Sequence, residues 1–291
     1  MTGLSDTSRG PAPARTSRGP APARSKRIRL GAVGYLNARP LVYGLDRSSR
    51  FAVRYDVPSE CARLLHAHEI DVGLIPSIEY LRGGPYAIVP NLAIASRRSV
   101  ASVAIFTTKP IGEVTSIALD TSSRTSVALV RILCARLYRI QPRLESRGPD
   151  LEDMLAHCDA ALVIGDNALF QSTPIHKIDL GEAWMTLTGL PFVWAFWAGR
   201  PDALTAADVE ALQHARDEGV QRPEELARQY LAGAPKRQEA GARYLRQNIQ
   251  YYLGSEELEG LRTFYRYATE LGLAPCEGTL NFYDAEHSGA D

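Results

Sequence analysis

Residues 28–45 have the sequence IRLGAVGYLNARPLVYGL, and this stretch decides the fold class. Its first nine residues are a short apolar run that ends in glycine and a turn, which is typical of a buried strand. The following NARPLVYGL is typical of a short helix that begins near Asn37. A strand-like run at 51–57, a helix from Pro58 and a buried strand at 70–81 complete a strand–helix–strand–helix–strand unit. That order predicts a parallel sheet with right-handed crossovers.

The rest of the chain predicts a second unit of the same kind. Two extended runs without a helix between them end at Lys109, which indicates a crossing between lobes. The strands expected at 115–120 and 160–166 flank a helix from Thr125, and the chain beyond Gly199 has helical spacing. The sequence therefore predicts an α/β protein of two lobes with a ligand cleft between them. The expected divisions are a basic head (1–27), a first lobe with C-terminal helices (28–107 plus 200–284) and a second lobe (108–199).

Composition excludes several classes of protein. Residues 1–27 carry six basic residues and one acid, and TSRGPAPAR occurs there twice, so we expect a disordered head. The remainder holds 27 basic and 32 acidic residues, which does not suit nucleic-acid binding. No apolar run is long enough for membrane insertion. The cysteines are far apart and lack metal-ligand spacing, which favours buried thiols and a cytoplasmic location: Cys61, Cys134, Cys158 and Cys276.

The stretch ALDTSSRTSVALVRILC (118–134) crowds hydroxyl groups between a strand and a helix. Asp120 ends the strand, and the helix begins at Thr125. Backbone N–H groups, the positive end of the helix dipole and the hydroxyls make such a junction suited to an anion, above all a carboxylate. Arg124 would add a bidentate contact. A simple helix cap at Ser123 is the alternative. The candidate anion ligands are Thr121, Ser122, Ser123, Arg124 and Thr125.

Other candidates follow the ends of further strands, where ligands of parallel sheets bind. Asn37 and Ser77 are expected to face the cleft from the first lobe. Asp166, which ends the run VIGD, either faces the ligand or caps the next turn, and Glu79 is either a general acid or base or a salt-bridged carboxylate. No phosphate-binding loop, dinucleotide fingerprint, nucleophile elbow or zinc motif occurs, so no cofactor and no metal are expected.

Several long motifs in order resemble the chorismate dehydratase family of the futalosine route to menaquinone. They are VGYLNARPLVYGL (33–45), PSECARLLHAHEIDVGLIPSIEYL (58–81), IALDTSSRTSVALVRILC (117–134), AALVIGDNAL (160–169) and DLGEAWMTLTGLPFVWAFWAG (179–199). The resemblance implies a type-II periplasmic-binding-protein fold and a cytoplasmic lyase that dehydrates chorismate to 3-[(1-carboxyvinyl)oxy]benzoate. It suggests catalytic roles for Asn37 and Ser77, and substrate binding by the junction and Asp166. The duplicated head departs from the family.

The matched motifs place few carboxylates and no histidine at the cleft. We therefore expect the enolpyruvyl carboxylate of the substrate to accept the proton, with Glu79 or Asp166 as the rival base. A solute-binding protein for small carboxylates and the sister enzyme that forms a dihydroxynaphthoate are the alternative functions. The expected partner is a small molecule rather than nucleic acid or membrane, and a homodimer is left open.

Overall fold

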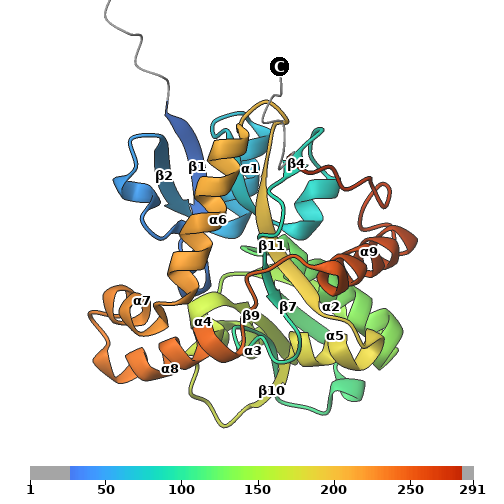
Figure 1. The fold of residues 1–291 in the computed structure, drawn as a ribbon. Coiled ribbons are helices and arrows are strands. Elements are labelled where there is room, and N and C mark those ends of the chain that lie inside the picture. The colour runs from blue at the N-terminus through green and yellow to red at the C-terminus, as the bar shows by residue number, and fades with distance from the viewer. Residues whose placement is uncertain (1–26, 284–291) are drawn as a thin grey trace, which may run out of the picture.

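A computed structural model describes residues 27–283, which fold into two α/β lobes (Figure 1). The head expected at 1–27 lies outside the described residues except for Arg27. The first sheet has the strand order β2-β1-β3-β11-β4, and β5 also pairs with β11. Its strands are β1 (Ile28–Val33), β2 (Phe51–Asp56), β3 (Val72–Pro76), β4 (Ala87–Ile88), β5 (Ile94–Ser96) and β11 (Phe192–Gly199). Strand β1 runs parallel to β2 and β3, as the opening motif predicts.

The second sheet repeats this core with the order β10-β6-β9-β7-β8. Strand β7 runs parallel to β8 and β9, and all five residues of β7 and of β9 are buried. Its strands are β6 (Val103–Thr107), β7 (Ser116–Asp120), β8 (Arg143–Arg147), β9 (Ala160–Ile164) and β10 (His176–Asp179). The two sheets and their covering helices confirm the predicted two-lobed α/β class.

Two strands correct the lobe boundaries expected from the sequence. Strand β6 belongs to the second sheet, antiparallel to β9, although its residues were expected in the first lobe. Strand β11 belongs to the first sheet, antiparallel to β3, although its residues were expected in the second. Both strands are buried along their whole length. A continuous apolar strand shows that it lies inside a sheet but does not show which sheet, so the pattern could not assign these two.

Helices cover both sheets, and short 3₁₀ helices follow several strands. The latter are η1 (Leu36–Val42), η2 (Leu45–Arg47), η3 (Ser77–Leu81) and η4 (Ile111–Glu113), and a π-helical turn, η5 (Cys134–Tyr138), extends α2. The α-helices among strands are α1 (Pro58–His66), α2 (Arg124–Leu133), α3 (Leu151–His157), α4 (Gly165–Leu169) and α5 (Leu180–Thr188). The C-terminal helices are α6 (Ala206–Val220), α7 (Pro223–Tyr230), α8 (Pro235–Gln247) and α9 (Ser255–Glu270), which confirms the predicted helical tail.

The C-terminal helices link the lobes. Helix α6 lies along the first sheet, whereas α7 and α8 lie beside α4 of the second lobe (Figure 1). Arg237 of α8 stacks on Phe170 at the end of α4, and the Tyr244 hydroxyl donates to Ser102 Oγ at 2.7 Å. No helix among residues 27–283 is long and apolar enough to cross a membrane.

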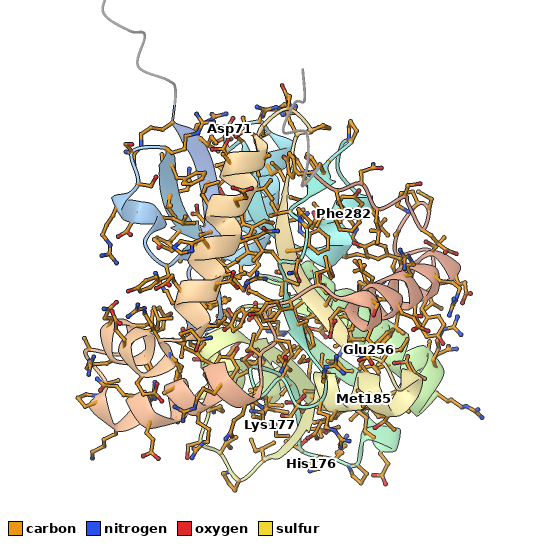
Figure 2. All side chains as sticks on the ribbon, viewed as in Figure 1. Asp71, His176, Lys177, Met185, Glu256 and Phe282 are labelled. Atoms are coloured by element: carbon orange, nitrogen blue, oxygen red, sulfur yellow. The ribbon has the colours of Figure 1, made fainter. Side chains whose placement is uncertain are left out.

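The two ends of the first sheet have different roles. Asp71, just before β3, lies at the amino ends of the parallel strands (Figure 2). Its carboxylate pairs with Arg29 of β1 at 2.7 Å and with Arg200, just after β11, at 3.2 Å. Together these charges lower the pKa of Asp71 despite partial burial, which opposes ionisation. This end is closed by ion pairs, so the carboxyl ends of the strands are left to face the other lobe.

Candidate active site

A small cavity lies between the lobes at the carboxyl ends of the strands. Its volume is about 40 Å³, space for one or two water molecules. The lining residues come from both sheets and from the helices that follow their strands: Val33, Tyr35, Asn37, Pro58, Pro76, Ile94, Val100, Ser102, Val103, Ser123, Ser126, Ile164, Gly165, Trp194 and Ala195. An organic acid with a six-membered ring would enter only when the lobes move apart, so the structure has its lobes closed.

Helix starts converge on this cavity. Tyr35, Pro76 and Ser123 directly precede η1, η3 and α2, while Pro58 and Gly165 are the first residues of α1 and α4. The first N–H groups of a helix have no partner within the helix, and the helix dipole is positive at this end. The positive ends of helices from both lobes therefore surround the cavity, which favours an anion. In this closed arrangement the Leu36, Ser59 and Ile78 N–H groups donate within the protein.

One glycine is required for this close approach. Gly165 has φ +63°, a conformation that glycine adopts without strain. A Cβ atom there would lie 2.9 Å from the ring of Tyr35 in the opposite lobe. Any larger residue would hold the lobes apart at the cavity.

Among the described residues that line the cavity, none is acidic or basic. The only titratable lining group is Tyr35, and burial raises the pKa of its phenol, so it is a neutral donor at pH 7. Trp194 forms an apolar wall because its ring N–H donates to Ser96 Oγ at 3.1 Å. The cavity thus offers directed neutral donors on an apolar background.

Asn37 has an unpaired polar atom, as expected of a side chain that binds a ligand. Its Oδ1 atom is buried and has no hydrogen-bond partner within residues 27–283. A buried amide oxygen without a partner costs about 1–3 kcal/mol. Because Asn37 also lines the cavity, a ligand hydroxyl could supply the missing donor. The structure therefore places the predicted Asn37 at the site.

The junction Thr121–Ser126 is divided between the cavity and its supports. Ser123 and Ser126 line the cavity, and their hydroxyl oxygens lie 2.9 Å apart. The Ser122 hydroxyl instead donates to Asp120 at 2.6 Å. Ser123 also caps α2, accepting from the Ser126 N–H. The two predicted interpretations, a cap and a ligand-facing hydroxyl, thus apply to the same residue.

Ser77 and Thr125 form a contact between the lobes rather than a lining of the cavity. Both are fully buried, and their hydroxyl oxygens lie 3.3 Å apart. Ser77 Oγ donates to the Val193 carbonyl at 2.8 Å, and Thr125 Oγ1 accepts from the Ile78 N–H at 3.2 Å. Neither is among the residues that line the cavity. In this closed arrangement the structure does not bring these two predicted residues to the site.

Arg124 and Thr121 point away from the cavity. Arg124 Nη1 pairs with Glu79 Oε2 at 2.8 Å, and both Arg124 and Thr121 line a surface depression on the outer face of α2. The helix repeat explains this placement, because residue 124 cannot share a face with 123 and 126. The expected bidentate contact from Arg124 to a ligand in the cleft is therefore not formed.

Glu79 is a structural carboxylate. Its side chain is 1 % exposed and contacts Arg82 at 2.9 Å, Arg124 at 2.8 Å and His66 at 3.2 Å. Burial alone would raise the pKa of Glu79, but the hydrogen bonds of His66 and Arg82 and the charge of Arg124 lower it. Of its predicted roles, the structure favours the salt-bridged carboxylate.

Asp166 lies beside the cavity without lining it. Its carboxylate accepts a hydrogen bond from Tyr230 of α7 and a long one, 3.4 Å, from the Leu36 N–H at the start of η1. Burial raises the pKa of Asp166 against these two hydrogen bonds and the charge of Arg39. Asp166 therefore ties the second lobe to the first and to a C-terminal helix.

Some residues of the site were missed from the sequence. Tyr35 and Ser126 lie next to predicted positions, so the strand-end and junction rules would have found them. Trp194 carries only the signal of an aromatic residue in a buried strand. Ser102 and Tyr230 have no local signal, because only the tertiary fold brings β6 and α7 to the cleft. Within the part of the chain that the structure describes, no group of His, Cys, Asp and Glu side chains could hold a metal ion.

Comparison with known proteins gives a family match and several structural neighbours. The family model described as menaquinone biosynthesis matches residues 28–270. The chorismate dehydratase of Thermus thermophilus is 33% identical over 268 residues, which cover 84% of this chain and 95% of that protein. Among solved structures, a protein of Archaeoglobus fulgidus has a TM-score of 0.69 at 17% identity, covering 86% of this chain and 100% of its own. The periplasmic aliphatic sulphonate binding protein of Escherichia coli has a TM-score of 0.61 at 14% identity, covering 87% and 94%. These neighbours confirm the predicted periplasmic-binding-protein-like fold.

Proposed function

The chain belongs to the menaquinone biosynthesis family, and on that premise we propose that it dehydrates chorismate to 3-[(1-carboxyvinyl)oxy]benzoate. The futalosine route is the proposed pathway for this step. The observation that carries the assignment of the site is the cavity between the lobes, which is lined by helix starts and neutral polar side chains from both lobes on an apolar background. Chorismate carries two carboxylates on a small apolar frame, and the polar and apolar groups that line the cavity suit such a molecule once the lobes have moved apart to admit it.

The reaction needs little from the protein apart from orientation and charge stabilisation. A proton leaves the ring carbon that bears the ether oxygen, and its C–H electrons form a ring double bond. The neighbouring C–O bond breaks, and the hydroxide that leaves combines with the proton as water. The ring becomes aromatic, so the product is favoured. We propose that Ser123, Ser126 and the α2 amides bind one carboxylate of the substrate. Asn37 is proposed to bind the hydroxyl that leaves.

The proton acceptor is proposed to be the enolpyruvyl carboxylate of chorismate itself. Support comes from the lining of the cavity, where no described side chain is a base at neutral pH. Glu79 is held by cations outside the cavity, and Asp166 is held by Tyr230 and the Leu36 amide. The substrate carboxylate is tethered to the reacting carbon through the vinyl carbon and the ether oxygen, so it reaches the proton without help from a side chain.

The direct test mixes the purified protein with chorismate and follows aromatisation in the ultraviolet spectrum, with the product identified by its mass. We expect turnover without an added metal or cofactor. Asn37→Ala should lower kcat/KM about 100-fold, because it removes the amide oxygen that accepts a hydrogen bond from the leaving hydroxyl and positions it. Ser49→Ala is the matched control, since Ser49 is exposed and remote from the cavity. A spectrum that stays unchanged over hours would favour a solute-binding protein instead.

A second test separates the two proton acceptors. Asp166→Asn and Glu79→Gln each remove a carboxylate and keep the shape of the side chain. If the substrate carboxylate is the base, kcat should fall about tenfold or less in either variant, because only positioning is lost. A loss of several orders of magnitude in one variant, with folding and product binding intact, would make that residue the base.

A further inference from the structure

Helix α2 has a second polar site on the face opposite the cavity. A depression of about 550 Å³ lies there, and it is far larger than the cavity itself. Four residues of α2 line it at helical spacing, namely Arg124, Val127, Ala128 and Arg131. Ser123 and Ser126 of the same helix line the cavity. One helix therefore separates the two sites.

The depression is strongly basic. It is lined by Arg82, Arg124 and Arg131, and Glu79 is the carboxylate that two of them contact. The Arg131 residue is exposed, and its guanidinium forms no hydrogen bond or ion pair with any side chain or backbone group of residues 27–283. A guanidinium has five N–H donors, and Arg82 and Arg124 use only one or two of theirs. Most of these donors remain available to a ligand.

Neighbouring acids do not cancel this charge. Glu60, next to Ser59 on α1, pairs with Arg63 at 2.8 Å. Glu270, at the end of α9, pairs with Arg136. The charge facing the depression therefore remains that of three guanidinium groups and one buried carboxylate. Planar guanidinium groups match phosphate and carboxylate oxygens, two bonds at a time.

The depression spans both lobes. Ser59 and Arg82 follow strands of the first sheet, whereas Thr121 and Arg131 follow β7 of the second. The lobes touch here through the Ser59 N–H, which donates to the Ser122 carbonyl at 2.9 Å. A ligand that contacts both sides would bind the closed arrangement better than an open one, and it would shift the equilibrium toward closure.

We propose that this depression binds a small multivalent oxyanion, with phosphate groups or several carboxylates, and that its occupancy holds the lobes closed. The site is separate from the cleft, where neutral donors and not arginines line the cavity. Because catalysis requires the lobes to open for substrate and product, the bound anion inhibits turnover. The binding itself does not depend on the proposed reaction.

The test measures binding by calorimetry, with pyrophosphate and citrate as separate probes in a low-salt buffer. We expect saturable binding of at least one, and the two probes distinguish a phosphate ligand from a polycarboxylate. Arg131→Gln should weaken binding about tenfold, since it removes one of three charged partners. Arg243→Gln, which removes an exposed arginine of α8 that does not line the depression, should leave the affinity unchanged.

Other outcomes would overturn the proposal. No saturable binding of either probe, or equal weakening in the two variants, would show diffuse electrostatics and no site. If Arg131→Gln still binds the anion with the parent affinity, and the product of the reaction displaces that anion, the anion binds in the cleft and not in the depression. In turnover assays kcat should fall with the same midpoint as binding, and Arg131→Gln should need about tenfold more anion while keeping its basal activity. Binding without this inhibition would refute the coupling to lobe closure.

Discussion

Glu79 is a fully buried carboxylate and Asp166 a half-buried one, both at the contact between the lobes, and their surroundings differ in kind. Glu79 faces two arginines and a histidine. Asp166 faces a phenol and a backbone amide, with Arg39 the contributing charge. Burial opposes ionisation of both, yet the pKa of Glu79 is lowered and that of Asp166 is raised. Cations in contact outweigh the loss of water, whereas neutral donors do not.

This difference has consequences for stability with opposite signs. A carboxylate whose pKa is lowered by folding stabilises the protein at neutral pH, and that contribution is lost as pH falls. A carboxyl whose pKa is raised binds its proton more tightly when folded, so its contribution declines as pH rises. Glu79 should therefore act as a fixed ionic link between the lobes. Asp166 should instead lower the stability of the fold when it is ionised. Substitutions at these two sites test the comparison directly.

The largest effect is expected from Glu79→Gln. The change leaves Arg82 and Arg124 without their carboxylate, and it should lower the free energy of unfolding by about 2 kcal/mol at pH 7. The figure is reduced from that of a fully buried pair because both arginines are partly exposed. Urea unfolding of the variant and the parent protein measures the difference.

The matched control is Glu69→Gln. Glu69 pairs with Arg63 at 3.0 Å, but both side chains are 49% exposed, so a change within about 0.5 kcal/mol is expected. The pH dependence adds a second check on Glu79. Its contribution is complete above the ordinary carboxyl pKa of 4.5 and is lost as pH falls through the lowered value. Equal losses in both variants, or a gap that persists in strong acid, would contradict the fixed ionic link.

The next effect concerns a donor to Asp166. Tyr230→Phe removes the hydroxyl that bonds Asp166 and the Gly34 carbonyl, while the ring can still stack on Arg39. We expect a loss of about 1 kcal/mol in the free energy of unfolding, since one partly buried hydrogen-bonding group disappears. Tyr252→Phe is the control, because Tyr252 is an exposed tyrosine that also stacks on an arginine. A Tyr230→Phe variant as stable as this control would mean that α7 does not hold Asp166.

The same two carboxylates show where sequence reasoning reached its limit. Strand ends and hydroxyl-rich junctions are local features, and they indicated Asn37 and Ser123, both of which line the cavity. Apart from Arg82, which is three residues from Glu79, the hydrogen-bonding partners of Glu79 and Asp166 are 13 to 130 residues away in the sequence. Local patterns do not record such contacts, so the role of each carboxylate stayed open until the fold was known.

The junction residues give a second example. Ser123, Arg124 and Thr125 are consecutive, and the sequence predicted all three as ligands of one anion. A helix turns by about 100° per residue, so consecutive side chains must face different surroundings. Ser123 lines the cavity, Arg124 faces the outer depression and Thr125 is buried against Ser77. The fold was predictable because the patterns of strands and helices repeat along the chain. Which of three consecutive side chains faces the cavity, the outer depression or the other lobe depends on the elements that pack around the turn.

The smallest change in the free energy of unfolding is expected from Asp166→Asn, and its sign tests the comparison most directly. The amide keeps an oxygen that can accept from the Leu36 N–H, and it removes a charge that burial disfavours. We expect the free energy of unfolding at pH 7 to stay the same or to rise by less than about 1 kcal/mol. As pH rises from 3.8 through the raised pKa of Asp166, the parent protein should lose stability relative to this variant. The reason is that the folded state binds the proton of the Asp166 carboxyl more tightly than the unfolded state does. Urea unfolding between pH 4 and pH 7 measures this slope, and a loss above about 2 kcal/mol at pH 7 would show that Asp166, like Glu79, is stabilised as an anion.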